Sequence, residues 1–142
     1  MRIEDVMVTE VETIEPSATL VDAAHRMRDA NVGMLPIVEG GRVSGVITDR
    51  DIVVRAVARD VNPASVRVAD CATSEPVCAQ PDWDLEHAMT VMADRQIGRL
   101  PVVDAAGTLV GVVTLSSLAL RSHEREETLD AAQEVARRSA RA

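Results

Sequence analysis

The order of apolar and polar positions in the first half of the chain predicts alternating strands and helices. Residues 20–30 read as an amphipathic helix, because Leu20, Ala23, Ala24 and Met27 recur at helical spacing and fall on one face. Ser17 precedes this segment and is a candidate N-cap. The other predicted elements are an extended segment at 12–15, strands at 35–38 and 43–47, a hairpin turn at 39–42 and a helix opening at Thr48.

The second half repeats this pattern. Arg2, Pro16 and Gly33 match residues 65 positions further on, and after one added residue in the second turn the shift becomes 66. The repeat supplies a candidate N-cap at Asp82 and a second helix face of Leu85, Ala88, Met89 and Met92. The remaining counterparts are an extended segment at 77–80, strands at 100–103 and 109–113, and a helix opening at Thr114.

The repeat predicts an α+β fold of two β-α-β-β-α motifs with a helical tail. We expect motif 1 at residues 1–60, a linker at 61–66, motif 2 at 67–123 and a charged helical tail at 124–142. One motif leaves a face of its sheet uncovered, so we expect the two to pack with pseudo-two-fold symmetry and form two related clefts. In the tail, a thin apolar stripe is expected to dock or fray: Leu129, Ala132, Val135 or Ala136, and Ala140.

Composition narrows the functions that this fold can have. The chain has 142 residues, no Phe or Tyr, and a net charge of −8, so its core is aliphatic. Nucleic-acid binding is excluded in general, because it requires basic clusters and, for single strands, aromatic platforms. No apolar run reaches the ~18 residues of a membrane span. Trp83 reads as a cover on the first helical turn or, alternatively, as a stacking surface for a purine.

Cysteine and histidine usage predicts a reducing, cytoplasmic protein without a metal site. Cys71 and Cys78 do not form a disulfide framework, and both read as small hydrophobic residues. His25, His87 and His123 are too scattered for metal-ligand spacing, and the first two are expected to be exposed.

Thr48-x-x-Asp51 opens a predicted helix and has two interpretations. As a capping box, the threonine hydroxyl and the aspartate carboxylate satisfy backbone N–H groups at the helix start. As a ligand site, the carboxylate accepts hydrogen bonds from two vicinal hydroxyls of a ribose. From spacing alone, capping is the more common explanation, and the two roles compete for Asp51.

The segments Gly33-Met34-Leu35-Pro36-Ile37-Val38 and Gly45-Val46-Ile47-Thr48-Asp49-Arg50-Asp51-Ile52 resemble the cystathionine-beta-synthase-type (CBS) domain. Gly98-Arg99-Leu100-Pro101-Val102-Val103 and Gly111-Val112-Val113-Thr114 resemble a second copy. The resemblance implies a tandem CBS pair, or Bateman module, of the short stand-alone type. Such pairs commonly bind AMP, ADP, ATP, S-adenosylmethionine or NAD between the motifs, regulate a partner protein and form homodimers.

Carried over to this chain, the resemblance places one complete site in the first cleft. Asp51 and Thr48 would hold the ribose, while Arg99 and Arg50 are candidate phosphate contacts or, alternatively, solvated charges. The predicted residues of this better cleft are Thr48, Arg50, Asp51, Val77, Cys78, Ile97, Gly98, Arg99, Leu100 and Pro101.

The second cleft departs from the family pattern and is expected to be weak or empty. Ser117 stands where the ribose-binding aspartate is expected, and Met34 stands at the position of Arg99. The predicted residues of this weaker cleft are Thr13, Ile14, Val32, Gly33, Met34, Leu35, Pro36, Thr114 and Ser117.

These observations favour a non-catalytic sensor that binds one adenosine-containing ligand, requires no cofactor and regulates an unidentified partner. The alternative is a ligand-independent scaffold, of a stress-related kind, that acts through its dimer surface and tail. An enzyme is not expected, because the sequence offers no nucleophile–base pair, metal cluster or glycine-rich phosphate loop.

Overall fold

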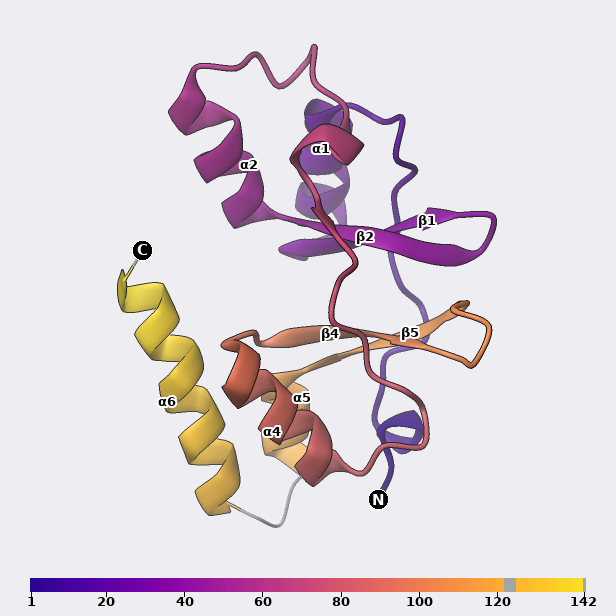
Figure 1. The fold of residues 1–142 in the computed structure, drawn as a ribbon, viewed down its shortest axis with the longest axis vertical. Coiled ribbons are helices and arrows are strands. Elements are labelled where there is room, and N and C mark those ends of the chain that lie inside the picture. The colour runs from indigo at the N-terminus through magenta and orange to yellow at the C-terminus, as the bar shows by residue number, and fades with distance from the viewer. Residues whose placement is uncertain (122–124, 142) are drawn as a thin grey trace. The chain divides into compact units, whose positions relative to one another are not determined.

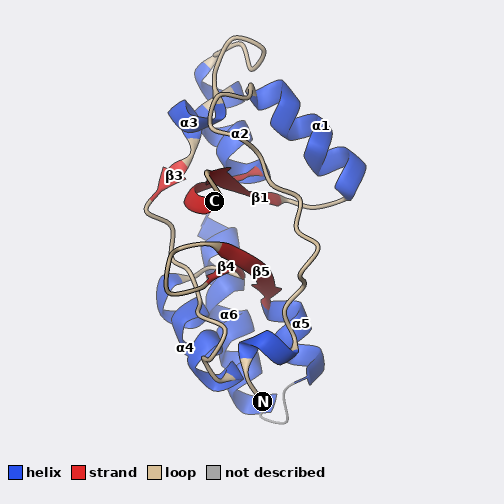
Figure 2. Ribbon diagram, turned by 90° about the vertical axis from the view of Figure 1, so that its right-hand side faces the viewer, coloured by secondary structure: helices blue, strands red, loops and turns tan. Residues whose placement is uncertain are grey.

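The computed structural model describes residues 1–121 and 125–141, and the chain divides into two compact units (Figure 1). Unit 1 contains Met1–Val11, Val77–Ala106 and Val110–Ala142. Unit 2 contains Glu12–Pro76 and Gly107–Leu109. Each unit is mixed α and β, as the sequence predicts (Figure 2).

Unit 2 is a three-stranded antiparallel sheet covered by helices. The strands lie in the order β1 (Met34–Glu39), β2 (Arg42–Thr48) and β3 (Thr73–Ser74), with a register shift between Ile37 and Val38. Its helices are α1 (Leu20–Ala30), α2 (Asp49–Arg55), α3 (Val68–Cys71) and the 3-10 turn η2 (Val57–Arg59). The core is wholly aliphatic and includes Ile14, Leu20, Leu35 and Ile47.

Unit 1 repeats this plan with an added C-terminal helix. Its hairpin is β4 (Arg99–Val103) and β5 (Leu109–Thr114), of which Leu109 is grouped with unit 2. Its helices are η1 (Ile3–Asp5), α4 (Leu85–Arg95), α5 (Leu115–Arg121) and α6 (Arg125–Arg141). Leu85, Ala88, Met89 and Met92 are all buried in the core, as predicted for this helix face.

The opening segment of each sequence repeat packs in the unit formed mainly by the other repeat. In unit 1, the Ile3 N–H donates to the Trp83 carbonyl at 2.8 Å, and Val8 and Val112 exchange two hydrogen bonds of 2.9 Å. In unit 2, the Val68 N–H donates to the Ala18 carbonyl at 2.7 Å. Ile3 and Val68 are both fully buried. The compact units therefore do not follow the linear repeat boundaries.

Both long helices occupy the predicted ranges, but their caps lie two residues later than expected. Thr19 and Asp84 are the N-caps, in place of Ser17 and Asp82. The Thr19 hydroxyl accepts from the Asp22 N–H, and the Asp22 carboxylate accepts from the Thr19 N–H. This reciprocal pair fixes the helix start. Ala24, expected on the buried face of α1, is exposed.

The predicted extended segments contribute single bridging residues. Ile14 makes a parallel bridge to Ile37, and Ala79 makes the equivalent bridge to Val102. The N–H of each bridging residue donates to a proline carbonyl on the neighbouring strand, and its carbonyl accepts from a valine N–H on the same strand. Pro36 and Pro101 lack an N–H but serve as acceptors, so they fit inside hydrogen-bonded strands.

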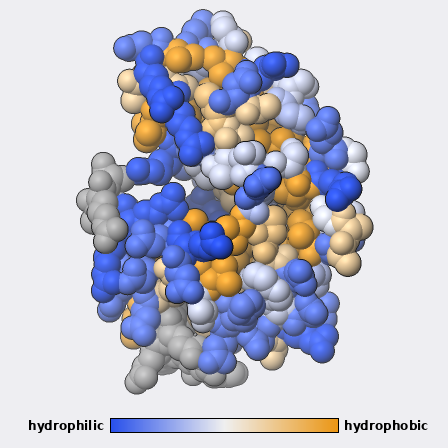
Figure 3. Space-filling view, viewed as in Figure 1, coloured by the Kyte–Doolittle hydropathy of each residue, from blue (hydrophilic) through white to orange (hydrophobic). Residues whose placement is uncertain are grey.

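The tail forms the expected helix, α6, but the predicted apolar stripe is only partly correct, since Val135 alone of its described side chains lies on the docked face. Ala131 is buried in the core of unit 1, whereas Leu129 and Ala132 are exposed. The face of α6 that packs on unit 1 also includes Glu134, Val135 and Arg138. Because two of these residues are charged, the buried face cannot be recognised from the spacing of apolar residues. The side chain of Ala140 lies outside the described residues. Figure 3 shows hydrophilic residues over the visible side of α6 (blue, lower left).

Gly45 and Gly111, equivalent in the two repeats, are approached closely by another segment. A Cβ at Gly45 would lie 2.8 Å from the Thr73 carbonyl oxygen, and one at Gly111 would lie 2.9 Å from the Val8 carbonyl oxygen. We predict that Gly45→Ala destabilises the protein by about 1–3 kcal/mol, because β3 must move away. Gly98→Ala is the matched control, since its nearest contact would be an ordinary 3.7 Å. Urea unfolding measures both, and equal midpoints would contradict this prediction.

Candidate functional site

The Thr48-x-x-Asp51 pair is a capping box at the start of α2. The Asp51 N–H donates to Thr48 Oγ1 at 3.0 Å, and the Thr48 N–H donates to Asp51 Oδ2 at 3.0 Å. The local sequence produces this arrangement because Thr48 ends β2 in an extended conformation and exposes the first N–H groups of the helix. The capping interpretation of this motif is therefore correct.

Among residues 1–121 and 125–141, the second oxygen of Asp51 makes only a long ion pair. Arg55 Nη2 lies 3.6 Å from Asp51 Oδ1, while the same guanidinium donates to the Cys71 carbonyl at 3.0 Å. A 3.6 Å separation is too long for a hydrogen bond, so Oδ1 retains capacity to accept one. The Asp51 side chain is 13% exposed. Capping by Oδ2 and acceptance from a ligand hydroxyl by Oδ1 are thus compatible.

The equivalent pair in the other motif has no second side-chain oxygen beside the one that caps the helix. Ser117 Oγ donates to the Thr114 carbonyl at 2.9 Å and accepts from the Thr114 N–H at 3.3 Å. The Ser117 N–H in turn donates to Thr114 Oγ1 at 3.1 Å. The only proton of the serine hydroxyl is already used, and the group carries no charge. This geometry agrees with the sequence expectation that Ser117 is a poor substitute for aspartate.

Five of the unit 1 residues of the better cleft, 97–101, surround the start of β4. Gly98 immediately precedes β4 and Arg99 begins it, and the Gly98 carbonyl accepts from the Leu115 N–H at 2.8 Å, which ties the start of this strand to the start of α5. Arg99 is exposed, and its guanidinium forms no ion pair with the described residues. Leu100 and Pro101 are buried. Arg99 is therefore the accessible cation of this half.

Val77 and Cys78 precede the bridging residue Ala79 and are both half-buried. Burial raises the pKa of the Cys78 thiol, because desolvation disfavours the thiolate. Because the thiolate is the reactive form, a higher pKa makes Cys78 a weaker nucleophile. The environment of Cys78 therefore favours a lining role over redox chemistry.

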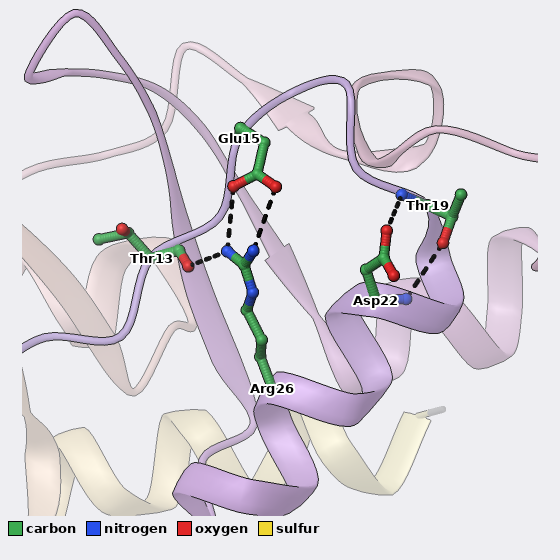
Figure 4. Close-up of polar contacts among 5 residues, drawn as sticks. All are labelled: Thr13, Glu15, Thr19, Asp22 and Arg26. Carbon is green, nitrogen blue, oxygen red and sulfur yellow. Dashed lines mark hydrogen bonds and ion pairs between the residues drawn. The ribbon is translucent and has the colours of Figure 1, made fainter.

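The unit 2 residues of the weaker cleft are positioned by a contact that the sequence did not reveal. The Arg26 guanidinium on α1 donates to both carboxylate oxygens of Glu15, at 3.1 Å each, and to the Thr13 carbonyl at 2.8 Å (Figure 4). This fork fixes the chain on either side of Ile14. The equivalent residues of the second repeat are Gln80 and Val91, so the charged pair belongs to the first repeat alone.

The other residues predicted for the weaker cleft are mostly apolar and covered. Ile14, Met34, Leu35 and Pro36 are buried, and Gly33 is half-buried. Val32 is exposed. This half therefore offers few polar side chains to a charged ligand.

Each predicted cleft draws residues from both units. Thr48, Arg50 and Asp51 belong to unit 2, and the other residues of the better cleft belong to unit 1. Thr114 and Ser117 belong to unit 1, and the rest of the weaker cleft belongs to unit 2. The structure brings together the members of each half, and the joining of the halves stays a prediction.

The described part of the chain offers neither a metal cluster nor a membrane span. Within it, His, Cys, Asp and Glu side chains do not gather in groups of three that could hold a metal ion. No helix in the same residues has the length and apolar content needed to cross a membrane. His25 and His87 are exposed, and His87 contacts the ring of Trp83. Trp83 packs partly against the core of unit 1, in agreement with its expected role as a cover.

The Glu15–Arg26 pair predicts a measurable pH dependence. Hydrogen bonding to Arg26 lowers the pKa of Glu15, so the pair stabilises the fold above the pKa of the unfolded state and this contribution is lost on acidification. We predict that Glu15→Gln costs less than about 1 kcal/mol at neutral pH, because the pair is exposed. The cost should be smaller at about pH 3, because this pH is below the usual glutamate pKa and approaches the lowered pKa of Glu15 in the folded state.

Urea unfolding of wild type and Glu15→Gln at both pH values measures this difference. Glu12→Gln is the control, since exposed Glu12 makes no ion pair with the described residues. A pH-independent cost of Glu15→Gln would contradict the assigned ion pair.

Comparison with known proteins supports the resemblance found in the sequence. The CBS domain family matches residues 3–57 and 68–124. The CBS domain-containing protein YhcV of Bacillus subtilis is 40% identical over 124 residues, which cover 87% of this chain and 87% of YhcV.

Solved structures share the fold. The structure of Hypoxic Response Protein I with two coordinated zinc ions superposes with a TM-score of 0.79 at 29% identity, over 86% of this chain and 99% of that one. The CBS domain pair of MJ0100, in complex with 5-methylthioadenosine and S-adenosyl-L-methionine, gives 0.77 at 25% identity, over 85% and 94%. With both repeats matched by the family and the same fold in these relatives, the chain belongs to the CBS-domain family as a tandem pair.

Proposed function

We propose that this chain is a non-catalytic regulatory module that binds one adenosine-containing ligand. The ligand class comprises AMP, ADP, ATP, S-adenosylmethionine and NAD. The observation that carries the proposal is the state of Asp51, whose Oδ2 caps α2 while Oδ1 retains acceptor capacity. The adenosine derivatives bound by the related MJ0100 pair support the same ligand class.

The proposed site combines a carboxylate for the ribose with cations for a phosphate. Asp51 would accept from the ribose hydroxyls, and Thr48 would keep its helix-capping role. Arg99 and Arg50 are exposed, so their guanidinium groups are available to a phosphate against the overall charge of −8. The purine would contact the aliphatic side chains of Val77, Ile97 and Pro101. Without Phe or Tyr in the chain, this contact would be aliphatic.

The second site would be weak or empty, which gives one ligand per chain. Its serine hydroxyl is satisfied by Thr114, and Met34 is buried where the better site has an exposed arginine. Binding would then bias the arrangement of the motifs and so the affinity for a regulated partner.

The chain is further proposed to act as a homodimer. Val53, Val54 and Val57 are exposed on α2 and η2, and with Arg50 they follow helical spacing and form an outward stripe. The equivalent of Val54 in the second repeat is Leu120, which is 85% exposed. Apolar residues exposed at equivalent positions of both repeats favour self-association. The same surface would serve the alternative function, a ligand-independent scaffold.

A nucleotide panel tests the ligand proposal. We predict that at least one of AMP, ATP, NAD and S-adenosylmethionine stabilises the wild type, by about 2.7 kcal/mol at 100 times its dissociation constant. Asp51→Asn should abolish most of this response, because the amide retains an acceptor for the Thr48 N–H but loses the charge. Thermal-shift measurement of each variant with and without ligand gives the difference.

Ser117→Ala is the matched control at the equivalent position and should respond as wild type does. Asp51→Ala, which removes the cap as well, should lower the intrinsic stability by about 1 kcal/mol. If no compound of the panel stabilises the wild type, or if Asp51→Asn responds fully, the ligand proposal fails and the scaffold function is favoured.

Light scattering tests the dimer. We predict that the wild type has the mass of a dimer and that Val54→Glu and Leu120→Glu together yield monomers, because buried unpaired carboxylates oppose association. Leu129→Glu places the same charge on an exposed position of α6 and should leave the dimer intact. A monomeric wild type, or equal dissociation by the control, would refute the assigned surface.

A further inference from the structure

Side chains of helix α6 hydrogen-bond to Gln96, in the turn between α4 and β4. Arg138 Nη1 donates to the Gln96 carbonyl at 2.8 Å, and Gln96 Nε2 donates to Glu134 Oε2 at 3.5 Å. A Cβ at Gly98 would lie 3.7 Å from Val135 Cγ1, so the two residues are in ordinary contact. All of these residues belong to unit 1. Figure 1 shows α6 (yellow) running beside α4.

At Gln96 this turn has a backbone conformation that glutamine rarely adopts. Gln96 has a φ of 54°, in the left-handed region, where it ends α4. Asn31 ends α1 in the same way with the same φ, and asparagine is several-fold enriched in this region. Unit 2, as described, has no counterpart of α6 beside Asn31. Glutamine, which tolerates this conformation less well than asparagine, thus occurs where α6 binds both its carbonyl and its side chain.

The turn also fixes the positions of the residues that follow it. The Ile97 N–H donates to the Met92 carbonyl at 3.0 Å, and the Gly98 carbonyl accepts from the Leu115 N–H at 2.8 Å. Arg99 comes next and begins β4. The conformation of Gln96 therefore sets the path of Ile97, Gly98 and Arg99, three of the residues assigned to the better cleft.

We propose that α6 is a positioning element for the ligand site, with Arg138 holding the Gln96–Arg99 turn through the Gln96 carbonyl. This inference rests on the proposed function, because it assigns a control to the same site. When α6 is docked, Gly98 and Arg99 are ordered for the ligand. When α6 is displaced, for example by a regulated partner, the strained turn relaxes and ligand affinity falls. By linkage, bound ligand favours the docked helix.

The test compares two arginines of α6. Arg138→Met removes the donor to Gln96 and keeps an unbranched side chain. Arg137→Met makes the same change one residue earlier, where the arginine pairs with Glu134. It therefore disturbs the partner of the Gln96 side chain but leaves the Arg138 bond to the Gln96 carbonyl in place, so the pair of variants isolates the carbonyl contact. Arg138→Lys restores a donor and a charge. Circular dichroism establishes that each variant is folded.

Amide hydrogen exchange without nucleotide gives the first readout. Arg138→Met should speed exchange at the Leu115 amide, which donates to Gly98, and at the Ile97 amide, which donates to Met92, by about fivefold or more, while Arg137→Met stays near wild type. Arg138→Lys should restore part of the protection. Equal exchange in Arg138→Met and Arg137→Met would overturn the positioning role.

Calorimetric titration with AMP, ATP, NAD and S-adenosylmethionine gives the second readout. For the compound that the wild type binds, we expect binding to Arg138→Met to be about fivefold weaker or more, with Arg137→Met unchanged. Unchanged affinity beside faster exchange would overturn the coupling. If the wild type binds none of the four compounds, the proposed function and the coupling both fail. A failure confined to α6 is recognised by normal wild-type binding with indistinguishable Arg138→Met and Arg137→Met variants.

Discussion

The fold depends on the reciprocal exchange of the two opening segments. Val8 pairs with Val112 in unit 1 and Val68 donates to Ala18 in unit 2, so each unit is completed by residues from the other repeat. Ile3 and Val68 are fully buried, and removing either would leave a cavity of the kind that costs several kcal/mol. A single repeat therefore cannot form its own complete core. The same exchange explains why Gly45 and Gly111, the points of closest approach, have no side chain.

The two repeats share this fold, but only the first has a carboxylate at the helix start that follows its hairpin. Asp51 and Ser117 occupy equivalent caps, but only the carboxylate has an oxygen left after capping. The stabilising contacts also differ between the repeats, since Arg26 and Glu15 stabilise the first repeat and α6 stabilises the second. Local stabilisation and ligand chemistry are thus distributed differently over two copies of one plan.

Local sequence patterns predicted the two hairpins and the helices α1, α2, α4, α5 and α6, because α1 and α4 have strong periodicity and the hairpin turns contain glycine. They did not predict the short helix α3 or the strand β3. They also predicted the pairing of Thr48 with Asp51, which depends on residues three apart. They missed contacts between residues distant in the chain: Arg26 with Glu15, Arg138 with Gln96, and β3 with β2. Linear comparison of the repeats likewise gave no sign that residues 1–11 and 67–76 exchange units, because hydrogen bonding between backbones leaves no composition signal.

The central claim is that one adenosine ligand is held by Asp51 on one unit and by the Gly98–Arg99 strand start on the other. Amide NMR titration of the full chain with AMP, ATP, NAD and S-adenosylmethionine in turn tests it most directly. We predict that, for at least one of the four compounds, the amides of Thr48, Asp51, Gly98 and Arg99 shift together along a single binding isotherm. The corresponding amides near Ser117 and Met34 should stay unchanged. Shifts confined to one half, separate isotherms for the two halves, or no shifts would contradict it.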